Sequence, residues 1–479
     1  MRKKFVTNLA FVLALNLLIK PIWIFGIDRN VQNLVGAADY GLYFALFNFS
    51  FLLNILLDVG ITNFNNRNIA QNNHLLNKHF SSLVILKIIL ACVYMTATLL
   101  CGLLIGYDVR LMKLLFILGV NQFLISFILY LRSNLAGLHL FKTDSVISVL
   151  DRIIMISICS ALLWGHFFPI KMDIMVFVYA QTTGYFLTAL ITFIIVMKKA
   201  QFLKLKWHFA FFIMILKQSY PFAVLVLLMS FYNRIDTVML ERLLPDGAFQ
   251  SGVYAQAFRL LDAANMIAFL FAGLLLPIFS RMIKYKESVE QLVKLSFTML
   301  ITLAIIVAVG CFFYSHEMMT LLYKANTANS SPVFGILMSC FVAISTTYIF
   351  GTLLTANNNL KELNIMAGCG MLVNILLNLY LIPRYKALGA ACTSLTTQFL
   401  TATIQVVIAQ YIFKFKINYR LITTLLVFIA GVIAISYFSK QTHYNWKINF
   451  VLMVAGSILW AFVIKLIRIK SMLRILKYG

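Results

Sequence analysis

Long apolar stretches, each close to the length of a membrane-spanning helix, follow one another along almost the whole chain. An α-helix needs about 20 apolar residues to cross the hydrocarbon core of a bilayer, and fourteen such stretches occur in the 479 residues. They cover residues 6–27, 41–59, 81–105, 112–131, 145–167, 173–197, 218–241, 252–279, 291–313, 333–356, 364–382, 388–412, 421–438 and 447–465. The connections between them are short, and none is long enough for an inserted soluble domain. The sequence therefore predicts an all-α integral membrane protein with about fourteen transmembrane helices.

The composition excludes the other broad classes of protein. Charged residues make up 11% of the chain and hydrophobic residues 62%, whereas a soluble protein carries roughly 25% charged residues. These values exclude an ordinary soluble enzyme and a disordered chain. The seven cysteines have no disulfide or metal-binding spacing, and the chain contains no GxxxxGK[ST] nucleotide-binding pattern. We therefore expect no catalytic centre, no metal site and no cofactor.

The net charge of +25 has two possible meanings. A basic face on a soluble domain indicates nucleic-acid binding, whereas basic residues in alternate loops indicate membrane topology. With the N-terminus inside, the inner segments hold 26 of the 40 lysines and arginines, and the outer segments hold ten. This bias favours a multi-pass protein with both termini in the cytoplasm and no nucleic-acid partner.

Three landmarks recur in the same order at similar offsets, which indicates an internal repeat. Gly41-Leu42-Tyr43 opens the second apolar stretch, and Gly252-Val253-Tyr254 opens the eighth, 211 residues later. The other two pairs of landmarks are Lys142 with Lys361 and Pro169 with Pro383. Repeats with an even number of spans are parallel. We expect two six-helix bundles around a central cavity that opens to alternate sides, followed by two extra helices.

This arrangement sets the expected domain boundaries. They are an N-terminal six-helix bundle over residues 1–197, a basic cytoplasmic linker over 198–217, a C-terminal six-helix bundle over 218–413, and two extra helices with a basic cytoplasmic tail over 414–479.

Two pairs of charged residues in the seventh and eighth stretches are candidates for a functional site. Arg259 and Asp262 are three residues apart and share one helix face. Arg234 and Asp236 are two apart, so at least one of them needs a partner on another helix. Charges in the hydrocarbon core usually face a cavity or bundle interior. Arginines suit an anionic head group, and the carboxylates are candidates for a coupling ion. Ion pairs that fasten spans together remain the alternative.

Four further charges lie in or beside the first three stretches. Lys20 lies inside the first stretch and is a third candidate cation, and Arg29 lies at its outer end. Asp58, near the inner end of the second stretch, either caps its helix or binds the coupling ion. Lys87 is close enough to the inner interface for its ammonium group to reach it.

At this level of detail the chain resembles the Wzx-type polysaccharide-unit flippases of the multidrug/oligosaccharidyl-lipid/polysaccharide (MOP) exporter superfamily. The resemblance covers nearly the whole chain, including the plan of six, six and two helices. Four segments carry it: Pro21 to Tyr43 with Arg29 between, Leu57 to Ile61, Arg234 to Ser280, and Pro383 to Ala391.

The resemblance implies transport of a lipid-linked oligosaccharide across the bacterial inner membrane. The cargo would be an O-antigen or capsule repeat unit on undecaprenyl diphosphate, of the kind used in lipopolysaccharide biosynthesis. Its diphosphate would meet the cavity cations Lys20, Arg29, Arg234 and Arg259. The coupling ion, a proton or sodium, would bind among Asp58, Asp236 and Asp262. Polysaccharide-assembly proteins are possible partners.

Three other functions stay open. A peptidoglycan lipid-precursor flippase of the same superfamily would show a similar basic cavity. A multidrug or cation antiporter would favour carboxylates and aromatic residues over the basic residues found in these spans. A membrane polysaccharide polymerase or ligase commonly needs a large outer loop, and the outer loops here are short.

Overall fold

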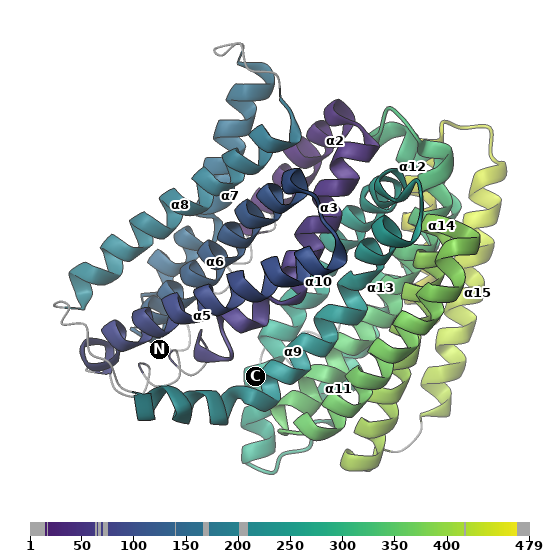
Figure 1. Ribbon diagram of the computed structural model, residues 1–479. Helices are drawn as coiled ribbons and strands as arrows, with labels where there is room; N and C mark the ends of the chain where they lie inside the picture. Colours follow the sequence, from purple (N-terminus) through teal and green to yellow (C-terminus); the bar gives the residue numbers. More distant parts are fainter. Residues whose placement is uncertain are drawn as a thin grey trace. The chain divides into compact units, whose positions relative to one another are not determined.

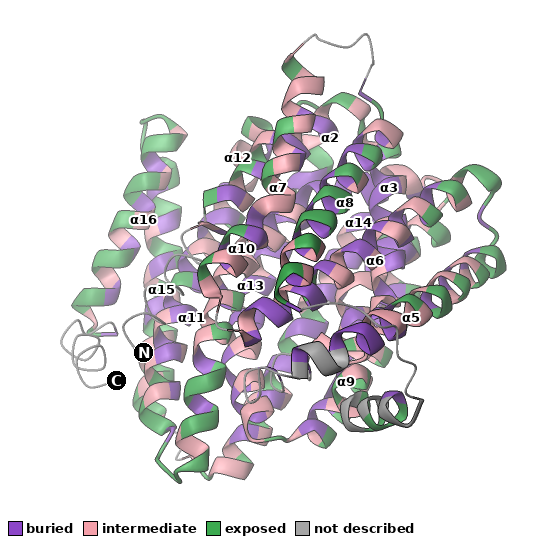
Figure 2. Ribbon diagram, turned by 90° about the vertical axis from the view of Figure 1, so that its left-hand side faces the viewer, coloured by how far each residue is buried: buried purple, intermediate pink, exposed green. Residues whose placement is uncertain are grey.

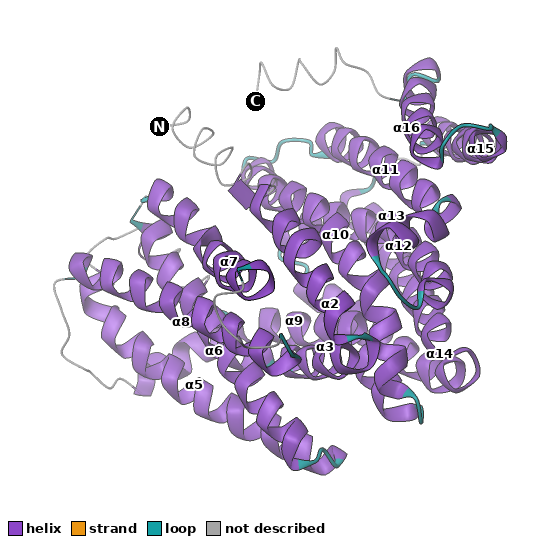
Figure 3. Ribbon diagram, turned by 90° about the horizontal axis from the view of Figure 1, so that it is seen from above, coloured by secondary structure: helices purple, strands orange, loops and turns teal. Residues whose placement is uncertain are grey.

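The computed structural model is helical throughout its described part, which comprises residues 15, 16, 18–62, 65, 69, 75–138, 140–165, 172–200, 209–415 and 418–466. No strand occurs among these residues (Figure 1, Figure 3). Eleven of the helices that they form are long and apolar enough to cross a membrane. Helices suit such a chain because they satisfy every backbone hydrogen bond within one segment, where no water is available. The all-α membrane fold predicted from the sequence is therefore confirmed.

The chain divides into two units, Met1–Arg242 with Asp246–Gly252, and Leu243–Pro245 with Val253–Gly479. Each unit is described separately. The first contains η1 (Ile22–Asp28), α2 (Arg29–Val35), α3 (Ala37–Leu52), η2 (Asn54–Leu57), α5 (Leu75–Ile105), α6 (Val109–Gly137), α7 (Phe141–Trp164), α8 (Ile174–Lys199) and α9 (Phe209–Leu243). The helix α10 (Gly247–Lys284) begins in the first unit and continues in the second. The second unit also contains α11 (Glu290–Phe313), α12 (Ser315–Leu322), α13 (Thr327–Ala356), α14 (Leu360–Phe413), α15 (Tyr419–Gln441) and α16 (Trp446–Val463).

The first unit is built around α6. This helix packs against α3, α5, α7 and α8, and its core positions include Leu115, Leu118 and Leu131, all fully buried. Side-chain oxygens cap the helices where the chain turns. Asp108 accepts a hydrogen bond from the Leu111 backbone at the start of α6, at 2.8 Å. A carboxylate at this position satisfies a backbone donor that would otherwise lack a partner.

The first two predicted spans are less regular than the sequence indicated. Residues Ile22–Asp28 form a π-helix, a form that is rare and frequent at functional sites. The second predicted span is not one continuous α-helix, because α3 ends at Leu52 and a 3₁₀ turn, η2, follows. Beyond it, Val59 has a positive φ of 42°, which is strained for a β-branched residue. Hydropathy cannot report such a break, because the residues around it remain apolar.

The second unit is built around α13, which packs against α11, α12 and α14. The 54-residue α14 contains the predicted eleventh and twelfth spans. They are separated at Lys386, whose φ of 53° and ψ of −133° interrupt the helix three residues after Pro383. This conformation is one that residues other than glycine rarely adopt. The two predicted spans are therefore two helices that meet at Lys386.

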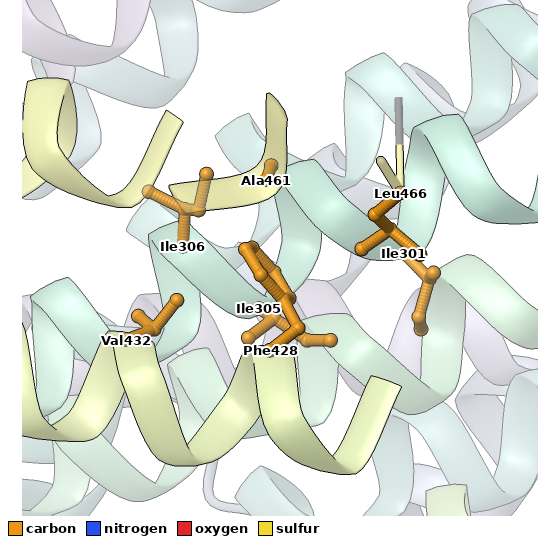
Figure 4. Close-up of a cluster of buried hydrophobic side chains, with 7 residues drawn as sticks. All are labelled: Ile301, Ile305, Ile306, Phe428, Val432, Ala461 and Leu466. Atoms are coloured by element: carbon orange, nitrogen blue, oxygen red, sulfur yellow. The ribbon is translucent and has the colours of Figure 1, made fainter. Parts of the chain in front are cut away.

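The last two helices form a pair beside α11, and α16 exposes much of its surface (Figure 2). Their buried face meets α11 in a cluster of Ile301, Ile305, Ile306, Phe428, Val432, Ala461 and Leu466 (Figure 4). The Trp460 indole lies against Gly431, where a Cβ would overlap it. The close approach of α15 and α16 therefore depends on the small residue at position 431.

Replacing Phe428 with alanine should weaken the attachment of α15 to α11, because its ring is fully buried in this cluster. We expect a loss of about 1–3 kcal/mol, less than the ~3–5 kcal/mol typical of soluble cores, since lipid tails are as apolar as the site. Thermal unfolding in detergent measures the effect. Phe438→Ala is the control, because Phe438 on the same helix is 65% exposed. Equal effects of the two substitutions would contradict the packing described.

Candidate functional site

A buried ion pair joins the broken second span to α5 in the first unit. The Lys87 ammonium group, on a side chain only 1% exposed, contacts a carboxylate oxygen of Asp58. It also donates to the Leu57 carbonyl oxygen at 2.9 Å and to the Ser126 hydroxyl at 3.0 Å. Lys87 thus lies inside the helical bundle rather than reaching toward the interface. Its three acceptors match the three donors of an ammonium group.

At the break in the backbone, Asp58 both accepts hydrogen bonds from the following turn and pairs with Lys87. Its side chain accepts hydrogen bonds from the backbone and the hydroxyl group of Thr62, so it caps the turn that follows. Lys87 supplies a positive charge at the Leu57 carbonyl, where η2 ends, and a cation is favourable at the end of a helix. The cap that Asp58 forms is on the turn after it and not on the second span itself, and its part in ion coupling stays a prediction.

A second charged group lies around Lys20, which is partly buried. This lysine interacts electrostatically with Arg152, Asp151 and Arg132. Arg132 on α6 already binds Asp144 on α7 through two hydrogen bonds, of 2.7 Å and 3.3 Å. The Arg152 Nε lies 3.6 Å from a carboxylate oxygen of Asp151. Three cations and two carboxylates thus lie near one another in this part of the first unit.

Arg152 is the member that sequence analysis missed. It is the twelfth residue of α7, about 16 Å from the start of that helix at 1.5 Å per residue, which is near the middle of a ~30 Å hydrocarbon core. Its guanidinium carbon lies 5.4 Å from the centre of the Trp23 ring and 5.7 Å from that of Tyr185. The sequence analysis named no charge in the predicted fifth span, 145–167, although Arg152 lies within it.

Asp28 and Arg29 differ in their surroundings at the junction of η1 and α2. Asp28 is 2% exposed and accepts hydrogen bonds from the Tyr40 hydroxyl at 2.8 Å and from Gln32 at 3.1 Å. It is therefore part of the packing between η1, α2 and α3. Arg29 is partly buried, and its Nε has no hydrogen-bond partner among the described residues. A buried donor without a partner is costly and is available to a ligand.

On α9, Arg234 is partly buried and Asp236 is fully buried. Arg234 donates to the Asn48 side chain on α3 at 3.5 Å, and its guanidinium carbon lies 5.3 Å from the centre of the Phe51 ring. Asn48 in turn donates to Thr237 at 3.3 Å. Asp236 is only 1% exposed. As the two-residue spacing indicated, Arg234 has its partner on another helix.

The end of α9 is anchored on the loop between α5 and α6. Tyr107 in that loop donates to Glu241 at 3.4 Å, and the Arg242 guanidinium carbon lies 3.9 Å from the centre of its ring. Burial, the largest effect, raises the pKa of the Tyr107 phenol above its ordinary value. The hydroxyl group therefore keeps its proton near neutral pH and remains a donor. This anchor fixes the helix that carries Arg234 and Asp236.

Arg259 and Asp262 belong to the second unit, one turn apart on α10 and both partly buried. Asn374 and Asn378 on α14 are fully buried, and Asn378 donates to Asn374 at 3.1 Å. Within the described chain, no group of three or more His, Cys, Asp or Glu side chains could hold a metal ion.

The predicted residues of the first unit do not form one cluster. Lys20, Asp58 and Arg234 each have a separate set of neighbours, around Arg152, Lys87 and Asn48. Their roles in binding or coupling stay predictions. The sequence did hold one signal for the missed group, since Asp151 and Arg152 interrupt an otherwise apolar stretch.

Comparison with known proteins decides the family. The model of a family described as polysaccharide biosynthesis protein matches residues 9–283, more than half of the chain. The chain belongs to this family. No curated protein matches the sequence.

Solved structures of the MOP superfamily share the fold of this polysaccharide biosynthesis protein. The lipid II flippase MurJ, in an inward closed conformation, matches with a TM-score of 0.70 and 14% identity over 96% of this chain and 97% of its own. An inward-facing multidrug resistance MATE family transporter matches with a TM-score of 0.61 and 13% identity, over 82% of this chain and 94% of its own. A MOP superfamily transporter from Pyrococcus furiosus matches with a TM-score of 0.60 and 15% identity, over 85% of this chain and 94% of its own. The predicted fold and the resemblance are therefore confirmed, and the proteins that share the fold are a flippase and transporters.

Proposed function

We propose that this chain is a flippase that moves a lipid-linked oligosaccharide, an O-antigen or capsule repeat unit on undecaprenyl diphosphate, across the bacterial inner membrane by alternating access. The observation that carries the proposal is the gathering of three cations, Lys20, Arg132 and Arg152, in the first unit. A charge at membrane depth is costly and usually marks a substrate path. A diphosphate would neutralise it and accept several charge-assisted hydrogen bonds.

The proposal gives each candidate residue a role. Lys20, Arg29, Arg234 and Arg259 would meet the diphosphate, and we add Arg152 to them because it lies near Lys20. Asp236, Asp262 and Asp58 are the candidates for binding a proton or sodium ion that drives transport. At Asp58 the ion would have to displace the Lys87 ammonium group, which already neutralises the carboxylate.

The proposed orientation has both termini in the cytoplasm, and three helix ends support it. Lys286, Lys414 and Lys465 follow α10, α14 and α16, and all three have positive φ angles between 53° and 57°. Lysine is favourable there because it interacts with the last carbonyl groups of a helix. All three ends lie on the side that the sequence predicts to be cytoplasmic, where basic residues collect, whereas Lys386, with a φ of 53°, lies at the break in α14 on the side predicted to be outside.

A peptidoglycan lipid-precursor flippase is the second candidate. The fold likeness to the lipid II flippase MurJ extends over 96% of this chain. Both lipids carry a diphosphate, so the charged group suits either cargo. The family description, polysaccharide biosynthesis, supports the first candidate. A flipping assay with both lipids side by side separates them.

Replacing Lys20 with glutamine should slow flipping at least tenfold. A hydrogen bond to a charged group contributes about 1.5–3 kcal/mol, which corresponds to a factor of roughly ten to one hundred. The assay measures how fast a fluorescent lipid-diphosphate oligosaccharide becomes accessible at the opposite leaflet of proteoliposomes. Lys440→Gln is the control, because Lys440 is 42% exposed beside Glu317 in the second unit. Flipping that is unaffected by Lys20→Gln, or absent in the unaltered protein, would contradict the proposal.

A further inference from the structure

The last quarter of the chain is basic and has no acidic residue. From Leu363 to Gly479 the sequence contains no aspartate or glutamate, and it contains twelve lysines and arginines. Eight of the twelve lie in residues 414–420 and 465–479, which the sequence predicts to be at the cytoplasmic ends of the last two spans. Basic clusters of this kind beside a membrane span are typical of proteins that bind anionic lipids. The charge pattern therefore indicates an anionic lipid as a partner of this end of the chain.

A cavity between α15 and α16 lies at the same end. Its volume is about 370 Å³, and it is lined by Arg420, Thr423, Thr424, Val427 and Ile464. This volume is in the range of small-ligand pockets, about 300–1,000 Å³. The 23 residues of α15 extend over about 34 Å, slightly more than a ~30 Å hydrocarbon core. The first turn of α15, which carries Arg420, is therefore at the depth of the lipid head groups.

Arg420 brings a positive charge to this cavity that no carboxylate neutralises. Among the described residues, its guanidinium group has no hydrogen-bond or ion-pair partner. It is the second residue of α15, whose first turn contains no acidic residue. The N-terminus of a helix carries a partial positive charge, so a cation there is unfavourable and an anion is favourable. An anionic ligand would neutralise the guanidinium group and the helix end together.

Two threonines beside Arg420 offer acceptors to a ligand. The Thr423 hydroxyl group donates to the Tyr419 carbonyl oxygen, and the Thr424 hydroxyl group donates to the Arg420 carbonyl oxygen, both at 2.7 Å. Each hydroxyl group has one hydrogen, which these bonds use, and its oxygen keeps the capacity to accept. A ligand that suits the cavity therefore needs an anionic group for Arg420 and hydroxyl donors for the threonines.

The deeper end of the cavity is apolar. Val427 and Ile464 line it, and Val427 is exposed. The Trp460 Nε1 donates to the Val427 carbonyl oxygen at 3.4 Å, which holds α16 against α15 at this depth. Val427 is seven residues, or about 10 Å, from Arg420 along the helix. Hydrocarbon chains suit this end, so the cavity has the polarity of a phospholipid.

We propose that the cavity between α15 and α16 binds phosphatidylglycerol from the surrounding membrane. The phosphodiester carries one negative charge, and the guanidinium group of Arg420 can bind two of its oxygens at once. The glycerol head group supplies hydroxyl donors to Thr423 and Thr424, and the acyl chains lie along Val427 and Ile464. Phosphatidylcholine has neither the net negative charge nor the hydroxyl donors. The inference goes beyond the proposed function, because the bound lipid is not the transported one.

Lipid binding to the full-length protein in detergent tests the proposal. Native mass spectrometry counts bound molecules while phosphatidylglycerol, phosphatidic acid or phosphatidylcholine with the same acyl chains is added. One phosphatidylglycerol should bind at least tenfold more tightly than phosphatidylcholine. Phosphatidic acid should bind with an intermediate affinity, because it keeps the charge and lacks the glycerol hydroxyl groups.

Two arginine variants assign the binding to the cavity. Arg420→Gln should lower the affinity for phosphatidylglycerol at least tenfold. Arg384→Gln is the matched control, because Arg384 is an exposed arginine of the same unit that does not line the cavity. Equal binding of phosphatidylglycerol and phosphatidylcholine, or unchanged binding in Arg420→Gln, would overturn the proposal. Phosphatidic acid that binds as tightly as phosphatidylglycerol would overturn the choice of lipid.

A second readout locates the lipid beside Trp460. In a variant whose other four tryptophans are replaced by phenylalanine, phosphatidylglycerol with brominated chains should quench the Trp460 fluorescence more than brominated phosphatidylcholine does. Adding Arg420→Gln should remove the difference. Equal quenching by the two lipids would place the bound phosphatidylglycerol elsewhere and overturn the site. If this variant does not fold, the mass spectrometry of Arg420→Gln decides. Neither readout requires transport, so a failure of the proposed function leaves both unaffected.

Discussion

Replacing Lys87 with methionine should destabilise the first unit by about 3 kcal/mol. Removing one partner of a buried ion pair typically costs about 3–5 kcal/mol, because the other charge is left without compensation. We expect the lower end of this range, since the Asp58 side chain is 26% exposed and water can solvate it. Three acceptors, Asp58, Leu57 and Ser126, lose their shared donor at once. Unfolding of the purified protein in detergent measures the loss.

Two further variants identify the cause. Lys142→Met removes a lysine that is exposed on α7, and such surface changes usually stay within about 0.5 kcal/mol. Adding Asp58→Asn to Lys87→Met should recover part of the loss, because the unpaired carboxylate is then gone. If Lys87→Met is no worse than Lys142→Met, the pair does not hold the broken span to α5.

Replacing Arg152 with glutamine should slow flipping of the lipid-diphosphate probe at least tenfold. The substitution removes the positive charge from the group around Lys20 and leaves the side chain polar. Arg152→Lys should restore flipping only in part. Lysine keeps the charge but lacks the planar fork that stacks on Trp23 and Tyr185 and can bind a phosphate with two hydrogen bonds.

The matched control for this experiment is Arg384→Gln. Arg384 also stacks on a tyrosine, with its guanidinium carbon 3.6 Å from the centre of the Tyr380 ring, but it is exposed in the second unit. Flipping by Arg384→Gln should match that of the unaltered protein. If Arg152→Gln flips equally well while remaining folded, the charge around Lys20 is structural and does not meet the cargo.

The membrane-spanning helices could be predicted from the sequence because length and hydropathy alone set them. The break after Leu52 could not, since it depends on the backbone angles of Val59 and on a lysine about thirty residues away in the chain. The partners of Lys87 and Asp58 are likewise set by how η2 and α5 pack. A charge inside an apolar stretch can be identified from sequence, but its counter-ion comes from another helix.

Arg152 shows a different limit. The apolar stretch around it was identified, and its position within that stretch was enough to mark it as a charge at membrane depth. A count of basic residues by loop does not reveal Arg152 as a charge inside a span, because such a count assigns basic residues to one side of the membrane or the other. The repeat was visible at the offset between Gly41 and Gly252, but a sequence offset does not tell whether corresponding positions touch.

On α3 and the first turn of α10, a Cβ added to Gly41 would overlap the carbonyl oxygen of Ala248, and one added to Gly252 would overlap that of Ala37. This reciprocal contact of Gly41 and Gly252 has a consequence for how such a chain can change over evolutionary time. A twofold-symmetric dimer has contacts of this kind, which are called isologous. In them, residue i of one chain contacts residue j of the other, and residue j of the first contacts residue i of the second. In a dimer of identical half-length chains, one glycine codon would serve both sides. In a fused chain the two codons mutate independently while the same steric limit acts on both. A larger residue at either glycine alone would therefore be tolerated only if α3 and α10 moved apart.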